Sequence, residues 1–491
     1  MQEEPLLLDL AGRALPTSFA GCEWEKEAGR ISREVPGELL AARTPDIPHL
    51  GELDCIRHFL NLSRRNVGVD TTFYPLGSCT MKYNPKVNER IAALEGFAGL
   101  HPYEETSDTA GMTEVLSGLA LALCEIAGLD AVTLAPSAGA HGELTGLFIL
   151  RAALDASGRS ERRVVLIPDS AHGTNPASAA LAGFTPQVLR SGPDGYLRLA
   201  DVQARLDASV AGMMITNPNT LGLFEREIRP IAEALHRAGG MLYMDGANMN
   251  ALAGIARPGD FGVDIMHFNP HKTFGSPHGG GGPGAGPVAV RGDLAPHLPP
   301  PAFVREGSAA RSLELDSRSI GRIRSFHGGI PVLLRAYAYI LRLGGRGLTQ
   351  AAETAVLCAN YLAALLRDDY ELPYPGRPMH EFVLSASVQK RAGVRALDIA
   401  KRLLDHGFHP PTVYFPLIVP EALMVEPTET ESRRTLDGFA HAMREIAREA
   451  RENPDLLRAA PYTTPVRCLD EVQAARRPIV TWRDREERPT L

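Results

Sequence analysis

A lysine between an apolar run and a glycine-rich stretch is the residue of this sequence best suited to covalent chemistry. Lys272 lies in the hexapeptide Asn269-Pro270-His271-Lys272-Thr273-Phe274, and a run of four glycines, Gly279–Gly282, follows it closely. A lysine amine must be uncharged to attack an aldehyde, and a confined apolar setting lowers a lysine pKa. The pattern is typical of a lysine that forms a Schiff base. A surface lysine beside a flexible loop has the same local pattern, so the surrounding elements must distinguish the two.

The elements around Lys272 predict an α/β domain. Apolar runs predict strands at 131–134, 163–168, 187–190, 211–216, 241–245 and 263–268. Helical periodicity is found at 112–127, 144–154, 199–207 and 226–238. This alternation is typical of a mainly parallel sheet with crossover helices. Ligand sites of such sheets lie outside the carboxyl ends of the strands, and the residues that follow the predicted strands are His172, Thr216, Asp245, Asn248, His271 and Lys272.

These residue types together predict a pyridoxal 5'-phosphate site. A carboxylate at Asp245 can pair with a protonated pyridine nitrogen and make the ring an electron sink. Ala247 and His172 are candidates for contacts with the two faces of the pyridine ring. A small-residue loop that opens a helix suits a phosphate. The expected cofactor-binding set is Lys272, Asp245, Ala247, His172, Ser137, Ala138, Gly139, Thr216, Asn248 and His271, with Lys272, His172 and Asp245 catalytic and Thr216 or Asn248 near the phenolic oxygen.

Each residue also has an ordinary structural interpretation. His172 could be a satisfied loop histidine, Asp245 a helix N-cap and Lys272 a surface charge, but their order on one α/β domain favours the cofactor site. The glycine run Gly279–Gly282 is not a dinucleotide-binding fingerprint, because it follows the lysine and lacks the required spacing.

Composition limits the other functions. The chain has 491 residues and a net charge of −7, with no basic block, which disfavours nucleic-acid and membrane-surface binding. The N-terminal apolar run is too short for a signal peptide, and no stretch reads as a membrane span. Six scattered cysteines without a Cys-x-x-Cys pair indicate thiols in a reducing cytoplasm, with no metal site expected. We expect an extended arm at 1–90, a large domain at 91–325, a smaller α+β domain at 326–455 and an irregular tail at 456–491.

Several longer stretches resemble one family, the glycine decarboxylase P-proteins of the glycine cleavage system, in the split, two-gene form. The similarity lies in 73–82 (FYPLGSCTMK), 171–176 (AHGTNP), 244–250 (MDGANMN) and 269–274 (NPHKTF), and continues at 410–416 (PPTVYFP) and 425–432 (VEPTETES). It covers nearly the whole chain and is most like subunit 2. The segment 326–331 (FHGGIP) departs from the family, whose members tend to have an aromatic-Gly-Asn-Phe run there.

The resemblance implies an aspartate-aminotransferase-like fold (fold type I) and decarboxylation of glycine, with transfer of the aminomethyl group to the lipoyl group of the H-protein carrier. Because single-chain relatives are about twice as long, it also implies a companion subunit 1, as a heterotetramer with two copies of each. Ser78, Cys79 and Thr80 become candidate contacts for glycine or the lipoyl arm. Two alternatives stay open: another fold-type-I amino-acid decarboxylase or lyase, and a non-catalytic structural subunit.

Overall fold

In a computed structural model the described residues are 4–10, 30, 34–40, 50–101, 103–105, 107–277 and 284–481. They divide into two compact units, one of residues 72–462 and one formed by 1–71 with 463–491. The described helices of the second unit are short except for α2 (Glu52–Arg65), and the others are η1 (Leu7–Leu10), η2 (Gly37–Leu39) and α16 (Glu471–Arg476). The expected domain boundaries at 90, 325 and 455 stay a prediction.

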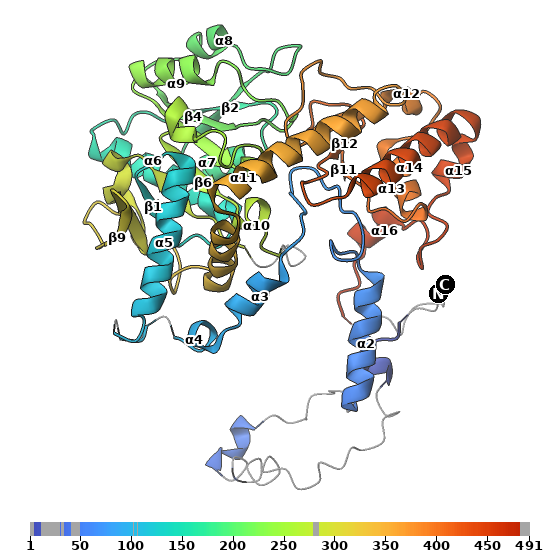
Figure 1. The fold of residues 1–491 in the computed structure, drawn as a ribbon, viewed down its shortest axis with the longest axis horizontal. Coiled ribbons are helices and arrows are strands. Elements are labelled where there is room, and N and C mark those ends of the chain that lie inside the picture. The colour runs from blue at the N-terminus through green and yellow to red at the C-terminus, as the bar shows by residue number, and fades with distance from the viewer. Residues whose placement is uncertain are drawn as a thin grey trace. The chain divides into compact units, whose positions relative to one another are not determined.

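A nine-stranded sheet forms the centre of 72–462 within the described residues (Figure 1). Its order is β3-β2-β4-β5-β6-β7-β1-β8-β9, and β3, β2, β4, β5 and β6 run parallel. The strands are β1 (Ala131–Thr133), β2 (Val164–Pro168), β3 (Thr185–Leu189), β4 (Val210–Thr216), β5 (Met241–Gly246), β6 (Ile265–Phe268), β7 (Val288–Val290), β8 (Ala302–Glu306) and β9 (Ala309–Leu313). The mainly parallel sheet expected from the sequence is confirmed.

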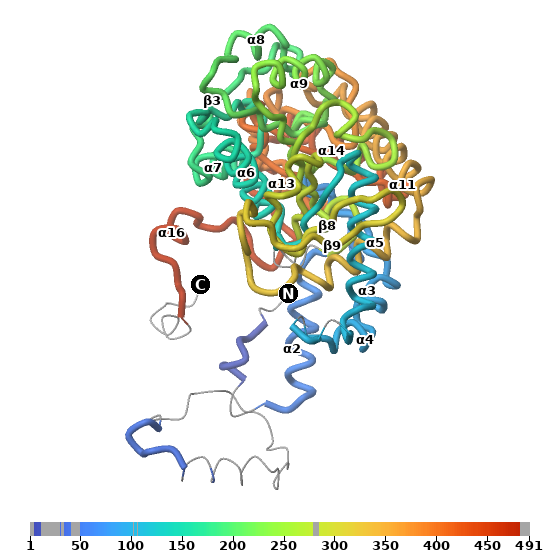
Figure 2. The backbone as a smooth tube through the Cα atoms, turned by 90° about the vertical axis from the view of Figure 1, so that its left-hand side faces the viewer, coloured from blue at the N-terminus to red at the C-terminus, as the bar shows by residue number. Residues whose placement is uncertain are grey.

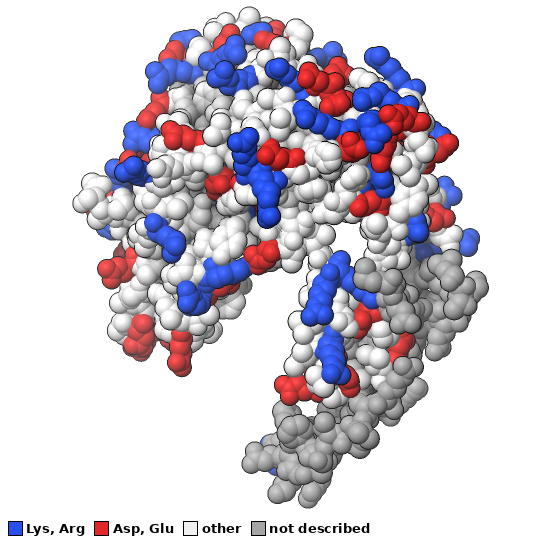
Figure 3. Space-filling model, turned by 45° about the vertical axis from the view of Figure 1, so that its right-hand side comes forward, with Lys and Arg blue, Asp and Glu red and all other residues white. Residues whose placement is uncertain are grey.

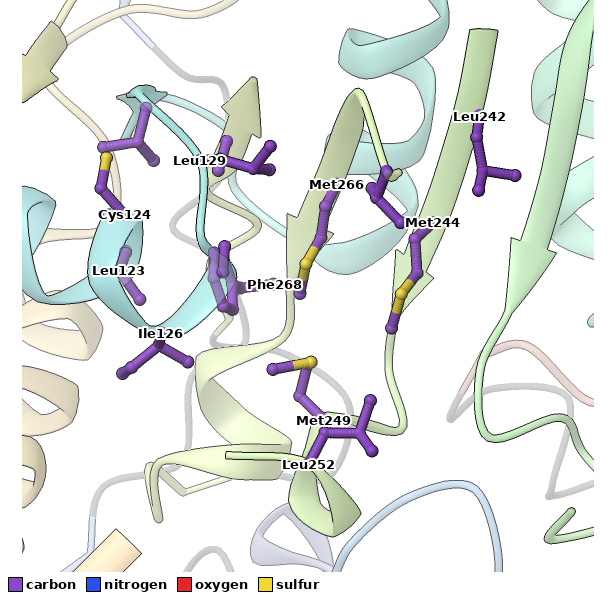
Figure 4. Packing of buried hydrophobic residues seen from close by; sticks show 14 of the residues in the cluster. Leu123, Cys124, Ile126, Leu129, Leu242, Met244, Met249, Leu252, Met266 and Phe268 are labelled. Carbon is purple, nitrogen blue, oxygen red and sulfur yellow. The ribbon is translucent and has the colours of Figure 1, made fainter. Parts of the chain in front are cut away.

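Alternation along the strands creates two apolar cores, one on each face of the sheet. Successive strand side chains point to opposite faces, so Leu242 and Met244 of β5 join one core while Met241 and Tyr243 join the other. Helices α5 (Ala110–Ala127), α9 (Ile228–Arg237) and the first half of α11 (Ile330–Leu366) cover the first face. Figure 4 shows Met244 and Met266 beside Met249 in this core.

Helices α6 (Gly139–Ala156) and α7 (Thr174–Leu181) cover the opposite face of the sheet and lie side by side in Figure 2. The remaining short helices of the large domain lie in loops that follow strands or precede helices. They are α3 (Lys86–Ala92), α4 (Glu95–Ala98), α8 (Leu199–Gln203), η3 (Met249–Ala251), η4 (Pro258–Phe261), α10 (Pro270–Thr273) and η6 (Gly292–His297).

A smaller domain follows α11. Its antiparallel sheet has the order β10-β12-β11, from β10 (Phe382–Ser385), β11 (Thr412–Val413) and β12 (Ala422–Val425). The helices beside it are α12 (Ser387–Lys390), α13 (Ala396–Asp405), α14 (Arg433–Glu452) and α15 (Pro454–Arg458). Helix α11 joins the domains: Gly344, at φ 60° and ψ −178°, interrupts it between a half in the large-domain core and a half in the small-domain core.

One region differs from the sequence-based expectation. The sequence predicts no strand at 302–313, and these residues form the β8–β9 hairpin at the edge of the sheet. An edge strand carries charged side chains that make it read as a loop. Near the end of the expected arm at 1–90, Phe73 is buried in the small-domain core and Lys82 donates a hydrogen bond to Asn250 of the large domain.

The distribution of surface charge agrees with a sequence that has no basic block. Basic and acidic side chains are interspersed over the face drawn in Figure 3. Helix α5 is long and apolar enough to cross a membrane by composition. Seven of its residues are buried, and it packs against β1, β8, β9 and α11, so it has the contacts of a core helix.

Candidate active site

A cavity of about 180 Å³ lies where β4, β5 and β6 end. Its lining includes eight of the predicted residues, namely Ser78, Gly139, His172, Thr216, Asp245, Ala247, His271 and Lys272. It also includes Ala140, Glu143, Thr174, Thr220, His267 and Asn269. Parallel strands bring their carboxyl ends to the same edge, which is why Thr216, Asp245 and Lys272 meet here.

Asp245 is a buried, ionised carboxylate at the end of β5. Its Oδ2 accepts a hydrogen bond from Asn175 Nδ2 at 3.0 Å, and its Oδ1 accepts one from the Ala247 N–H at 2.9 Å and lies 3.2 Å from His267 Nε2. Burial by itself would raise the pKa of Asp245, but His267, Lys272 and Asn175 outweigh it and hold that pKa well below its usual range. Asp245 therefore carries a negative charge at neutral pH and can hold a proton on a facing ring nitrogen.

A second carboxylate, Glu143 on α6, lies in the same network. Its oxygens accept hydrogen bonds from Thr174 Oγ1 at 2.8 Å, Asn175 Nδ2 at 3.1 Å and Ser178 Oγ at 3.2 Å. Burial and the charge of Asp245 raise the pKa of Glu143. Glu143 and Asp245 thus share Asn175 as a common donor, and this connection fixes α7 against the end of β5.

His267 supports Asp245 from the neighbouring strand. The Tyr243 OH lies 2.9 Å from His267 Nδ1, and Asn269 Nδ2 lies 3.2 Å from His267 Nε2. Sequence reasoning missed Glu143, Asn175 and His267. A signal was present for His267, because strand alternation turns it away from the apolar face that Met266 and Phe268 occupy.

Lys272 lies on the one-turn helix α10, which begins after Asn269 and has Pro270 in its first turn. It lines the cavity together with Asp245 and Glu143. The positive charge of Lys272 lowers the pKa of Glu381 and Glu426, two buried glutamates of the smaller domain, although burial, the larger effect, raises both. The surroundings of Lys272 are thus polar and acidic, unlike the apolar setting expected from the sequence.

The start of α6 packs closely against the lysine segment at Gly139. A Cβ on Gly139 would lie 2.0 Å from Asn269 Oδ1, so any larger residue there would displace the Asn269 side chain beside the lysine segment. The first N–H groups of a helix have no partner within it and can bind an anion. Ser137 and Ala138 precede the helix and lie outside the cavity lining. Arg324 Nη1 donates to Ser137 Oγ at 3.0 Å, a cation that sequence reasoning missed.

Thr216 and Asn248, the two residues predicted near the phenolic oxygen, have different surroundings. Thr216 Oγ1 is buried and lacks a hydrogen-bond partner within the part of the chain that the structure describes, so it has an unmet donor and acceptor at the cavity. Asn248 is not in the lining, because its Nδ2 donates to Pro218 O at 2.9 Å and to Glu381 Oε1 at 3.1 Å. His172 is exposed at the rim, and its ring meets Phe415 edge-on at 5.6 Å.

Of the predicted contacts Ser78, Cys79 and Thr80, only Ser78 belongs to the cavity lining. Burial raises the pKa of the Cys79 thiol, and Lys272 partly offsets that effect. The glycine run Gly279–Gly282 lies outside the described residues. The atypical segment 326–331 does not reach the Lys272 cavity, and it lines a separate apolar groove with Phe97 and Met112.

The arrangement fits pyridoxal 5'-phosphate. An ionised carboxylate, an amine-bearing lysine, an unpaired buried hydroxyl at Thr216 and a helix N-terminus line one cavity. They match, in that order, the ring nitrogen, the aldehyde, an oxygen of the ring and the phosphate of that cofactor.

Known proteins of similar sequence share one description. A family model described as glycine cleavage system P-protein matches residues 195–309, and one described as glycine dehydrogenase, C-terminal domain, matches 351–458. The chain is 54% identical over 449 residues, 91% of this chain and 92% of the relative, to probable glycine dehydrogenase (decarboxylating) subunit 2 of Caldanaerobacter subterraneus subsp. tengcongensis. It is 53% identical to the protein of the same name from Chlorobium chlorochromatii, over 96% of this chain and 98% of the relative.

Solved structures show the same fold. The crystal structure of an inhibitor-bound glycine decarboxylase (P-protein) of the glycine cleavage system has a TM-score of 0.71 at 21% identity, covering 88% of this chain and 99% of that chain. A NifS-like protein has a TM-score of 0.59 at 13% identity, covering 76% of this chain and 99% of that chain. The predicted fold type I is confirmed. With relatives above 50% identity along almost its whole length, the chain belongs to the family of glycine dehydrogenase (decarboxylating) subunit 2, the glycine cleavage system P-proteins.

Proposed function

We propose that this chain decarboxylates glycine as the cofactor-bearing half of a split glycine dehydrogenase, and passes the aminomethyl group to the lipoyl disulfide of a carrier. The family is dependent on pyridoxal 5'-phosphate. The observation that carries the proposal is that Asp245 and Lys272 line one cavity at the ends of neighbouring parallel strands, in a chain whose relatives are named glycine dehydrogenase (decarboxylating) subunit 2.

When bound, the cofactor would supply an aldehyde that reacts with amines and a ring that withdraws electrons. Lys272 is the residue that would hold the cofactor through that aldehyde. Asp245, kept ionised by His267 and Asn175, holds a proton on the ring nitrogen, which makes electron withdrawal effective. Glu143 and Asn175 fix the orientation of the Asp245 carboxylate.

The other predicted residues are assigned as holding groups. We assign His172 and Ala247 to the two faces of the ring and Thr216 to its phenolic oxygen, which their places in the cavity lining support. The N-terminus of α6 at Gly139 takes the phosphate, with Ser137 and Ala138 beside it. Arg324, bonded to Ser137 Oγ, adds a positive charge at that end.

A companion subunit 1 follows from the family, since the relatives are named subunit 2. We propose two copies of each subunit and a lipoylated H-protein as carrier. Helix α2 supports an interface, because large apolar side chains remain exposed along it: Leu53, Ile56, Phe59, Leu60 and Leu62. Among the described cysteines, Cys55, Cys79, Cys124 and Cys358 are free thiols, which supports the cytoplasmic location that we propose.

The test is exchange of labelled bicarbonate into the carboxyl group of glycine, with and without the companion subunit and with and without lipoylated carrier. We expect exchange only when both are present. The control is the same mixture with Lys272→Ala.

Exchange with this chain alone at the full rate would contradict the split arrangement. If the companion and carrier are present and no exchange occurs, while another amino acid loses carbon dioxide, the substrate assignment is wrong and another decarboxylase of this fold is supported. Release of free amine without any carrier would contradict the transfer step.

A further inference from the structure

The loop Ser78–Thr80 has a backbone conformation that residues other than glycine rarely adopt. Ser78 has φ 63° and Thr80 has φ 46°, both in the left-handed region. This region is uncommon for residues with a Cβ and is an outlier for a β-branched residue such as threonine. Such a conformation persists only where the surrounding contacts hold it, and it is found most often at functional sites. The contacts of this loop therefore need an explanation.

Two fully buried glutamates of the smaller domain hold the loop. The Ser78 N–H donates to Glu381 Oε2 at 2.7 Å, and the Thr80 N–H donates to Glu426 Oε2 at 3.0 Å. Both glutamates are 0% exposed. Their placement follows from strand register: Phe382 of β10 is paired with Val425 of β12, so the preceding Glu381 and the following Glu426 emerge together at one end of the sheet.

The chain before the loop adds to the same edge. Leu76 forms a bridge with Val425, the Gly77 N–H donates to Met424 O at 3.2 Å, and the Glu426 N–H donates to Pro75 O at 3.2 Å. A Cβ on Gly77 would lie 2.7 Å from Met424 O, so glycine is needed for this close pairing. Residues 75–77 thus lie along β12 and deliver the loop to the two glutamates.

The glutamates also connect the loop to the lysine site. Ser78 lines the cavity with Lys272. Glu381 Oε1 accepts a hydrogen bond from Asn248 Nδ2 at 3.1 Å, and Asn248 follows Asp245 by three residues at the end of β5. Glu381 is therefore the point at which the loop, the smaller domain and the carboxyl end of β5 are joined.

Charge in this cluster is balanced by protonation. Glu381, Glu426 and His380 each offer an atom within 4.8 Å of the others. Burial raises the pKa of Glu381 well above its usual value and that of Glu426 to about 7, and it lowers the pKa of His380 to about 3. The imidazole is then neutral, and the carboxyl pair carries a proton. A neutral or singly charged pair can be buried where two bare carboxylates could not.

We propose that Glu381 and Glu426 are positioning residues that hold the Ser78–Thr80 loop closed over the Lys272 cavity and thereby keep water from the reacting carbon. Only the last part rests on the proposed function. After carbon dioxide leaves, a proton from water at that carbon would give methylamine, so that glycine yields carbon dioxide and methylamine in equal amounts. With the loop closed, the carbon instead bonds to a lipoyl sulfur as the disulfide bond breaks and the other sulfur takes the electron pair.

The first test measures loop closure without turnover. Cys79, half-buried at the centre of the loop, is alkylated with iodoacetamide in the cofactor-loaded protein, and its labelling rate is read by peptide mass spectrometry. Glu426→Ala and Glu381→Ala should raise the rate about tenfold, the change in local opening expected when one buried hydrogen bond that holds the loop is lost. Glu421→Ala, a buried glutamate at the other end of β12, is the control and should leave it unchanged.

Glu426→Gln separates anchoring from charge. A glutamine keeps an acceptor for the Thr80 N–H but removes the carboxylate, whose charge also raises the pKa of Cys79. We expect its labelling rate to stay within about threefold of wild type, because the hydrogen bond that holds the loop remains. If Glu426→Gln and Glu426→Ala were labelled equally fast, the effect would be electrostatic and anchoring would be wrong.

The second test measures partition of the product in the complex with companion subunit and carrier. Methylamine released per carbon dioxide should rise in both alanine variants and stay low in Glu426→Gln and Glu421→Ala. Unchanged labelling in variants with native circular dichroism would overturn the proposal. Faster labelling with unchanged partition would overturn the water-exclusion role. Failure of glycine turnover in wild type would refute the proposed function alone, since the labelling result does not depend on it.

Discussion

Lys82 is the buried cation that joins three parts of the molecule, and replacing it by methionine tests how the lysine helix α10 is held. Its Nζ lies 2.7 Å from Glu429 Oε1 and donates to Asn250 Oδ1 at 2.6 Å and to Thr273 O at 2.9 Å. Thr273 is the neighbour of Lys272. Burial opposes the charged form, but Glu429 and Tyr339 outweigh it and raise the pKa of Lys82, so the ammonium is charged.

The loss of stability in Lys82→Met follows from the buried groups that remain after the ammonium is removed. Methionine preserves most of the apolar stem, so packing changes little. Glu429, whose side chain is 9% exposed, keeps its charge without the ammonium, and Asn250 and Thr273 lose a charge-assisted donor. Removing one partner of a buried ion pair costs about 3–5 kcal/mol. We therefore expect the free energy of unfolding to fall by about 4 kcal/mol.

A double-mutant cycle identifies the cause. Glu429→Gln in the Lys82→Met background removes the uncompensated charge and should recover about 2 kcal/mol. The assay is urea unfolding followed by far-UV circular dichroism, with the m-value compared among the four proteins. A loss below about 1 kcal/mol for Lys82→Met, typical of an exposed ion pair, would refute the reasoning. So would a double variant that is less stable than Lys82→Met.

Four further predictions concern the site and the pH dependence of stability. Lys272→Ala should abolish glycine turnover, and activity near that of wild type would contradict the central assignment. Asp245→Asn should leave the circular dichroism spectrum native and lower kcat by at least about 100-fold, since a neutral amide cannot hold the ring proton; an unchanged kcat refutes that role. Gly139→Ala should weaken cofactor binding in a fluorescence titration, because its Cβ would lie 2.0 Å from Asn269 Oδ1. Burial raises the pKa of Glu225 from 4.5 to about 7, so the native state retains a proton that the unfolded chain releases, and stability falls as the pH rises through about 7. The free energy of unfolding, measured with urea at pH 5.5 and pH 8, should fall by about 2 kcal/mol less in Glu225→Gln than in wild type.

The parts of the fold that the sequence predicted are those with a local signal. Apolar runs and helical periodicity located β2, β4, β5 and β6 and the helices α5, α6 and α9, because burial on a sheet face or helix face imposes a repeat on the sequence. The β8–β9 hairpin was missed, since an edge pair with charged side chains carries no such repeat.

The candidate site divides in the same way. Asp245 and Lys272 were identifiable in sequence because each follows an apolar strand, and the carboxyl ends of parallel strands meet at one edge whatever the details of packing. Glu143 and Asn175 needed the structure, because only the packing of α6 against α7 brings them to Asp245.

The sequence by itself determined the fold class and the family, and it supplied the main residues that we propose for the cofactor site, since these depend on residue types at fixed places along single strands and loops. Only the tertiary structure decided what holds those residues. Glu381 and Glu426 lie about 300 to 350 positions from the loop that they bind, and the pairing of Phe382 with Val425 brings them together. A buried carboxylate is marked by its surroundings, and surroundings assembled from distant segments leave no pattern along the chain.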